Sequence, residues 1–440
     1  MVKKFILAAV MLVSSVVPFS KKSAGVDDLV SEFRSQTKCG SVSVVVYDKG
    51  EFSYYGDAES LYQIGSMTKA FTGLAVQKLI SSGKLSKEDK VSDLIPGFTA
   101  YFGSSETDIT VENLLMQRSG YTNNENDYPA AKEGETLAEW ASEISGKQLK
   151  SKPGTEYEYS NVNYNLLGLI TEKVTGMSYR EYMEEEVLKP LGLAGVSVGK
   201  PADENSVIGG TRLGFRNVFG YETPVREGSI PAGYFYSNTA DIGRWLKAWI
   251  ENKDPDMDAV LENLNEKGDY YAGWERAEGD VIGHSGGTPN YSSRIVFSRS
   301  KGTGVCVLTN LNVASTTDSL CNSIFAELTG SGNTGLACDV WTVFDIIYTL
   351  VSAVFAALLL VIIIIRKKGL LAFLGSLSAI LTALVLILFP VIFGADIRSI
   401  AFTWAPWSFL SGIILMAACA AGSFLKLITV KVNEGRTKTG

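Results

Sequence analysis

Histidine and cysteine are both scarce in this chain. Its 440 residues include one histidine and five cysteines. A hydrolytic zinc site needs several such ligands at short spacings, and no spacing here matches one. The cysteines follow no disulfide framework, so we expect unpaired, mostly buried thiols; one disulfide among Cys39, Cys306, Cys321 and Cys338 stays compatible with the sequence. We predict no metal ion and no other cofactor.

Positive charge is under-represented in the long central part of the chain. Residues 25–338 contain 28 Lys and Arg residues against 43 Asp and Glu residues, a net charge of −15. Such a surface argues against nucleic acids and anionic lipid surfaces as partners. The simplest interpretation is that the negative charge keeps this part of the protein soluble. The length of this part suits one α/β domain with a helical subdomain.

Long apolar runs lie at the two ends. Lys3 and Lys4 precede an apolar run over residues 5–17, which has the length of a signal-peptide core. The cleavage site is ambiguous, with Ser20 and Ala24 as candidates, and an uncleaved anchor is the alternative. We assign residues 1–24 to a signal peptide and residues 25–335 to an extracytoplasmic domain.

The C-terminal quarter carries three further apolar runs, each long enough to cross a bilayer as a helix. They cover residues 341–365, 370–393 and 402–425, so that a three-helix membrane region spans 341–427 and a tail spans 428–440. Basic clusters follow the first and third runs and should be cytoplasmic. The protein is therefore expected in the cell membrane as a multi-pass protein, with its tail in the cytoplasm. The helices hold almost no charge, which favours an anchor, although small residues leave a protein partner open.

The first motif is Ser66-Met67-Thr68-Lys69, at the start of an apolar-periodic segment that ends near Gly83. Residues three apart share a helix face, so the Ser66 hydroxyl and the Lys69 amine should lie within hydrogen-bonding reach. A lysine withdrawn from water there loses its charge more easily and becomes a base. The pattern S-x-x-K alone is common, and its ordinary reading is a serine beside a solvated lysine.

The second motif is Tyr159-Ser160-Asn161, between the turn signal Pro153-Gly154 and an expected helix over 164–174. A tyrosine can move a proton between serine, leaving group and water. The Asn161 amide can hold a substrate carbonyl or steady Lys69. Taken alone, tyrosine and asparagine are ordinary loop residues.

The third motif is His284-Ser285-Gly286-Gly287, at the edge of an expected strand. Glycines there let a substrate backbone approach closely, and the Gly287 N–H can pair with the Ser66 N–H as an oxyanion hole. A single histidine is more often structural, but its place beside the other two motifs favours a role in the site. Lys69 and Tyr159 already supply the base chemistry, so His284 is not read as a base.

Together these segments resemble the class C β-lactamase and penicillin-binding-protein-like serine hydrolases. The resemblance includes residues 63–69, 114–120, 153–193, 230–249 and 283–310, in family order. It implies an α/β fold with an antiparallel sheet flanked by helices, plus a mainly helical subdomain. It also implies Ser66 as nucleophile, Lys69 as its partner, Tyr159 as general acid or base, and Asn161, His284 and Ser285 as substrate contacts. His284 stands where β-lactamases of this class have a lysine, which favours the peptidase and esterase branches.

The expected function is an extracytoplasmic Ser-Lys-Tyr hydrolase acting on amides or esters, with D-amino-acid-containing peptides as the favoured substrates. The resemblance extends to membrane-bound peptidases that activate prodrugs of nonribosomal pathways, which also end in three membrane helices. The alternatives are a penicillin-binding or sensing protein that is acylated with little turnover, and a carboxylesterase. Transpeptidation also stays open.

The coarse layout predicts one sheet shared by both ends of the central part. Strands are expected at 41–47, at 294–297 and at 304–308, and a second short strand after the first one ends at Tyr55. Helices are expected at 29–36 and 316–328, where they cover a sheet face. The middle is expected to be mainly helix and loop. The segment 251–268 is acidic and turn-rich, and we predict a surface insertion there.

Overall fold

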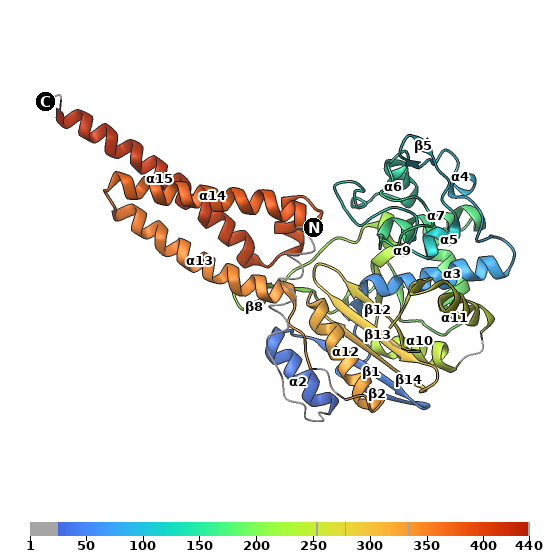
Figure 1. Ribbon diagram of the computed structural model, residues 1–440. Coiled ribbons are helices and arrows are strands. Elements are labelled where there is room, and N and C mark those ends of the chain that lie inside the picture. Colours follow the sequence, from blue (N-terminus) through green and yellow to red (C-terminus); the bar gives the residue numbers. More distant parts are fainter. Residues whose placement is uncertain (1–24, 252–253, 278, 333–334, 439–440) are drawn as a thin grey trace. The chain divides into compact units, whose positions relative to one another are not determined.

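A computed structural model describes residues 25–251, 254–277, 279–332 and 335–438 (Figure 1). The predicted signal peptide, residues 1–24, lies outside the described residues. The chain forms two compact units. The larger contains the described residues of 25–211 and 220–337, and the smaller contains residues 212–219 and 338–438.

A seven-stranded antiparallel sheet organises the larger unit. Its strand order is β10-β11-β12-β13-β14-β1-β2, so β1, near the start of the unit, pairs with β14, near its end. This confirms the prediction that both chain ends share one sheet. The strands are β1 (Val42–Asp48), β2 (Glu51–Tyr55), β10 (Tyr270–Tyr271), β11 (Trp274–Arg276), β12 (Ile282–Gly287), β13 (Ser292–Ser298) and β14 (Thr303–Thr309).

Helices cover both faces of this sheet. On one face, α12 (Ala314–Leu328) packs on β13 and β14, beside α2 (Val26–Thr37) (Figure 1). On the other, α10 (Thr239–Glu251) packs on β1 and β14. The core beneath α10 is aromatic: Trp245 stacks on Phe71 with ring centroids 4.0 Å apart, and Trp249 meets Trp274 edge-on at 5.0 Å. These rings bury large apolar areas and fix α10 against the sheet.

The helical part lies between β2 and β10 in the sequence. Its helices are η1 (Gly65–Met67), α3 (Thr68–Ser81), α4 (Val91–Leu94), α5 (Val111–Leu115), α6 (Leu137–Ile144), α7 (Asn161–Thr175), α8 (Tyr179–Tyr182), η2 (Met183–Leu188), η3 (Glu204–Ser206), η4 (Glu227–Ser229), α9 (Ile230–Gly233) and α11 (Pro255–Lys267). Its short strands are β3 (Tyr62–Gln63), β9 (Phe235–Ser237) and β6 (Ser197–Val198), which form one small sheet, and the pair β4 (Tyr101–Phe102) and β5 (Ser105–Glu106).

Helix α11 corrects the prediction of a surface insertion at 251–268. The Asp254 side chain caps the helix by accepting hydrogen bonds from the backbone N–H groups of residues 256 and 257. Met257, Val260 and Leu264 are buried, and α11 packs against α3. The acidic residues between these apolar positions occupy the solvent side, which is why the composition resembles a loop.

The smaller unit contains α13 (Val340–Ile364), α14 (Lys368–Phe393), η5 (Ser399–Trp404) and α15 (Trp407–Lys438). Three helices are long and apolar enough to cross a membrane, α13, α14 and the Trp407–Val430 part of α15. The third begins five residues later than predicted, because Ala405 and Pro406 interrupt the helix after η5. Helix α15 packs against both α13 and α14.

A hairpin from the middle of the sequence belongs to this smaller unit. Its strands are β7 (Thr211–Gly214) and β8 (Asn217–Gly220). Arg212 is 2% exposed and donates hydrogen bonds to the carbonyl oxygens of Ala401, Phe402 and Ala405, and its guanidinium lies 4.2 Å from the ring centroid of Trp407. The Asp345 carboxylate in α13 accepts from the backbone N–H of Arg216 at 2.7 Å. Arg212 thus satisfies carbonyl groups at the end of η5 that the helix leaves without partners.

Candidate active site

Ser66 lies in η1, directly before α3, where β12 passes against the backbone. A Cβ atom on Gly65, which has φ +53°, would lie 2.6 Å from the Gly287 nitrogen. A Cβ atom on Gly286 would lie 2.1 Å from the Ile64 carbonyl oxygen. Side chains at these two positions would force the segments apart, so glycine is required for the approach. The two predicted oxyanion-hole residues, Ser66 and Gly287, are therefore carried by segments in direct contact.

Lys69 points into the same place from the first turn of α3. Its side chain is fully buried, and its Nζ lies 3.1 Å from Ser66 Oγ, 2.7 Å from Asn161 Oδ1 and 2.7 Å from the carbonyl oxygen of Ala232. Burial lowers the pKa of Lys69 well below its usual value, and the Glu275 carboxylate opposes this shift. A neutral amine has two N–H groups and one lone pair. With Asn161 and Ala232 as acceptors, the lone pair is left for the Ser66 hydroxyl proton.

Tyr159 and Asn161 stand at the start of α7. The Ser160 side chain caps this helix by accepting from the Val162 N–H, which places Asn161 at its first residue, earlier than the helix start predicted at residue 164. The Tyr159 phenol hydrogen-bonds Ser66, and burial raises the Tyr159 pKa above its usual value. The Lys69 amine also lies 4.9 Å from the Tyr159 ring centroid. Tyr159 is thus a neutral phenol in contact with serine and lysine.

Gln117 is a positioning residue that the sequence analysis did not identify. Its side chain is buried, and its Oε1 accepts hydrogen bonds from the Ser160 backbone N–H, at 3.0 Å, and from the Asn163 amide. Gln117 itself has φ +57°, an uncommon conformation for a residue with a side chain. Residues 114–120 are one of the segments that resemble the family, but the resemblance assigned no role to Gln117.

His284 lies on β12 and is 2% exposed. Its Nδ1 lies 2.6 Å from the Ser285 carbonyl oxygen, its Nε2 lies 3.4 Å from the Tyr270 hydroxyl, and its ring lies 6.1 Å from the Tyr159 ring. Burial lowers the His284 pKa to about 3, and Lys69 in its protonated form adds to this shift. The imidazole is therefore neutral at physiological pH and offers no permanent positive charge to a carboxylate.

The Ser285 side chain is engaged by protein groups. Its hydroxyl donates to Asp318 at 2.9 Å and accepts from Arg294 at 2.9 Å. Arg294 also lies 3.9 Å from the Glu275 carboxylate, which in turn lies 4.0 Å from His284 Nε2. Asp318, Arg294 and Glu275 come from three different elements, and no sequence spacing connects them to the third motif. Through these hydrogen bonds and ion pairs, the three side chains hold β12 in its orientation.

The structure brings all three motifs together. Ser66, Lys69, Tyr159 and Asn161 are joined by hydrogen bonds, and His284 and Gly287 flank them on β12. Ser285 lies on the same strand, with its hydroxyl turned to Arg294 and Asp318. All five cysteines are free thiols, and four of them are buried, as predicted. Among the described residues, no group of three His, Cys, Asp or Glu side chains has the arrangement of a metal site.

Comparison with known proteins agrees with this arrangement. The β-lactamase family model matches residues 26–322. Two similar proteins are both named "Protein flp" and come from Staphylococcus aureus. The one from strain N315 is 32% identical over 57% of this chain and 53% of its own length, and the one from strain MRSA252 is 29% identical over 78% and 75%. The chain thus spans about half the length of the first of these relatives.

A third relative, "Putative D-alanyl-D-alanine carboxypeptidase" from Escherichia coli, is 34% identical over 30% of this chain and 33% of its own length. Among solved structures, an octameric penicillin-binding protein homologue from Pyrococcus abyssi has a TM-score of 0.61 at 24% identity, covering 71% of this chain and 78% of its own. A class C β-lactamase has a TM-score of 0.58 at 18% identity, covering 70% and 95%. The chain belongs to the β-lactamase family, with the β-lactamase and transpeptidase-like fold.

Proposed function

We propose that this protein is a membrane-anchored serine hydrolase that forms an acyl-enzyme at Ser66. The observation that supports it most is the contact between a fully buried lysine amine and the serine hydroxyl, 3.1 Å apart. Two fixed acceptors, Asn161 and Ala232, hold that amine so that its lone pair faces the serine. A lysine with a lowered pKa in this position is a base for a hydroxyl nucleophile.

Acylation follows from these positions. Lys69 takes the Ser66 proton as Oγ bonds to the carbonyl carbon of an amide or ester. The resulting oxyanion accepts hydrogen bonds from the Ser66 and Gly287 N–H groups. Tyr159, held as a neutral phenol by its raised pKa, gives its proton to the leaving nitrogen or oxygen and regains one from the Lys69 ammonium. The leaving group departs as the C–N or C–O bond breaks.

Deacylation reverses the proton path. Water enters where the leaving group was, and the Tyr159–Lys69 pair takes its proton as its oxygen bonds to the acyl carbon. Ser66 leaves with that proton restored to Oγ, and the acid product is released. An amine in place of water would give transpeptidation by the same route.

The substrates that we propose are peptides with D-amino acids. A relative that matches 30% of this chain carries the name of a D-alanyl-D-alanine carboxypeptidase. The neutral His284 separates this site from one that uses a lysine to hold a carboxylate, which favours peptidase or esterase activity over β-lactam hydrolysis.

We further propose that the hydrolase unit is extracytoplasmic and the C-terminus cytoplasmic. Residues 366–368, between the first two apolar helices, are Arg-Lys-Lys, and further basic residues follow the third. A single added cysteine at the exposed residue Glu133 should react with a membrane-impermeant maleimide in intact cells. Labelling at Glu133 only after cell lysis would contradict this orientation.

The function is tested in membranes that carry the full chain, treated with a fluorescent fluorophosphonate and a fluorescent β-lactam while intact mass is followed. We expect labelling that Ser66→Ala abolishes and Ser142→Ala, at an exposed serine in α6, preserves. Mass that returns to its starting value indicates turnover, and a stable adduct indicates a binding or sensing protein instead. Equal labelling of Ser66→Ala would refute the nucleophile.

A further inference from the structure

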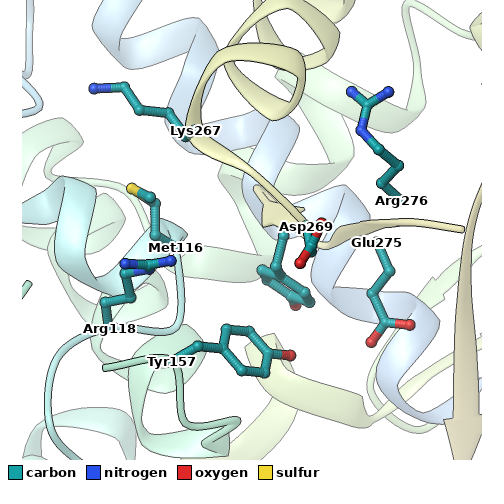
Figure 2. A pocket seen from close by; sticks show the side chains of 8 residues that line it. Met116, Arg118, Tyr157, Lys267, Asp269, Glu275 and Arg276 are labelled. Carbon is teal, nitrogen blue, oxygen red and sulfur yellow. The ribbon is translucent and has the colours of Figure 1, made fainter. Parts of the chain in front are cut away.

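A pocket of about 320 Å³ opens beside the catalytic residues and is not explained by the acyl-enzyme chemistry. It is lined by Met116, Arg118, Tyr157, Lys267, Asp269, Tyr270, Glu275 and Arg276 (Figure 2).

Two contacts connect this pocket to the reacting groups. Tyr270 forms part of its wall, meets the Tyr159 ring edge-on at 6.2 Å and lies 3.4 Å from His284 Nε2 through its hydroxyl. The Glu275 carboxylate lies 4.0 Å from the same nitrogen. The pocket wall therefore touches two residues of the candidate active site, Tyr159 and His284, so a substrate group held in the pocket lies next to them.

Two carboxylates, Asp269 and Glu275, form the acidic side of the pocket. Figure 2 shows the Tyr157 hydroxyl and the carboxylates of Asp269 and Glu275 gathered near the centre. Both carboxylates are close enough to raise the Tyr157 pKa, which burial brings to about 12. Asp269 is exposed, and no side-chain partner for it occurs among the described residues. With two tyrosine rings beside them, these carboxylates suit an ammonium group.

The basic side depends on one guanidinium. Lys267 pairs with Glu112 at 2.9 Å, Arg276 bonds Asn265, and both charged ends point away from the centre in Figure 2. Arg118 is half-buried, and within the part of the chain that the structure describes its guanidinium has neither an ion pair nor a hydrogen bond. In Figure 2 it lies across the pocket from Glu275. A carboxylate is the ligand that best matches a guanidinium.

We propose that this pocket is a substrate subsite for a zwitterionic amino-acid group, with Asp269 and Glu275 receiving its ammonium and Arg118 its carboxylate. Tyr157 and Tyr270 hold the carbon chain between them. The inference rests on the proposed hydrolase function and gives its substrate class: a peptide or amide with one residue that bears both free charges.

The test compares four substrates that differ only at the end of one side chain: a methyl group, an ammonium, a carboxylate, or both charges on one carbon. The set is made twice: in one series the varied side chain is on the acyl part of the substrate, and in the other it is on the leaving group. In one series we expect each charge to raise kcat/KM about tenfold, as a charge-assisted hydrogen bond does. Arg118→Gln should remove the gain from the carboxylate, and Asp269→Asn the gain from the ammonium.

Matched controls remove the same charges at exposed positions far from the pocket in the sequence, with Arg34→Gln in α2 and Asp93→Asn in α4. These should leave both gains intact. Equal kcat/KM for all four substrates in both series, or gains that survive Arg118→Gln and Asp269→Asn, would overturn the subsite while Ser66-dependent turnover still supports the hydrolase.

Binding to the full-length Ser66→Ala protein in detergent, measured calorimetrically with the same four compounds, separates the two proposals. Preference for the zwitterionic compound that Arg118→Gln abolishes supports the subsite even where wild-type protein hydrolyses nothing. Absence of that preference counts against the subsite, whatever the hydrolysis shows.

Discussion

At the scale of single residues, Lys69 is the group on which the proposed chemistry depends. A lysine in water is charged at neutral pH, whereas the fully buried Lys69 has a lowered pKa because its ammonium form lacks solvent. Its three polar neighbours fix the amine in one orientation. The packing of α3, α7 and α9 therefore sets both the position of the Lys69 amine and its affinity for a proton.

The proposed base role of Lys69 predicts a pH dependence. The neutral amine is the active form, so kcat/KM should rise with pH through the lowered pKa and reach a plateau below pH 10.5. Lys69→Arg, which stays protonated, should lower kcat/KM by about 10²–10⁴. Lys78→Arg in the same helix should retain the wild-type profile. A pH–rate profile of ester hydrolysis checks this, and full activity of Lys69→Arg would contradict it.

His284 predicts acid sensitivity of the fold. Its pKa is about 3 in the folded protein and near 6.5 when unfolded, so the unfolded chain binds more protons between these values. Its contribution to stability is complete above pH 6.5 and falls as the pH drops toward 3. His284→Gln should therefore reduce the loss of stability between pH 7 and 4, by at most about 3 kcal/mol. Thermal unfolding in detergent measures this difference, and an unchanged acid dependence would argue against a buried neutral imidazole.

At the scale of elements, the site depends on the close approach of β12 to η1. Neither segment holds the site alone, since the proposed nucleophile comes with η1 and the second proposed oxyanion donor with β12. The glycines at the crossing have no Cβ atom, and the backbone fills the space that a side chain would occupy.

This crossing predicts opposite outcomes for two neighbouring substitutions. Gly286→Ala places a Cβ atom 2.1 Å from the Ile64 carbonyl oxygen, so β12 has to move and kcat/KM should fall by about 10²–10³. Gly287→Ala meets nothing within 4 Å and keeps its N–H, so kcat/KM should change only severalfold. Rates of fluorophosphonate labelling, with circular dichroism to confirm folding, compare the two. Equal rates would show that the approach is not needed.

Sequence reasoning located the local contacts, and the family resemblance supplied the meeting of the three motifs, but the residues that position them from elsewhere in the chain were missed. The spacing of Ser66 and Lys69 predicts their contact because a helical turn fixes it. Gln117, in contrast, reaches Ser160 across 43 positions, and no local pattern indicates that. Helix α11 was missed because acidic residues separate its buried apolar positions.

At the scale of the whole molecule, the division into two units does not follow the sequence. Residues 212–219 belong with the helices that begin at 340, although the segments on either side of them belong to the larger unit. The sequence boundary predicted at 335–341 therefore describes only one of the places where the chain passes between units.

A prediction about truncation follows. A chain ending at Ala337 keeps the hairpin but loses α13, α14, η5 and α15, so the Arg212 guanidinium loses its three carbonyl acceptors. We expect this truncated chain to aggregate, because Phe215 and Phe219, already about half exposed, lose neighbouring cover. Replacing residues 212–219 with a short Gly-Ser turn should restore a monomer. Size-exclusion chromatography compares the two, and a monomeric first chain would contradict the prediction.

The hairpin also bears on release of the hydrolase from cells. A protease cut between α12 and α13 would sever one of the covalent connections between the two units. After such a cut we expect the larger unit to stay associated with the membrane helices, because the Arg212 hydrogen bonds to η5 lie elsewhere in the sequence. Release of the larger unit would then also require these hydrogen bonds to dissociate.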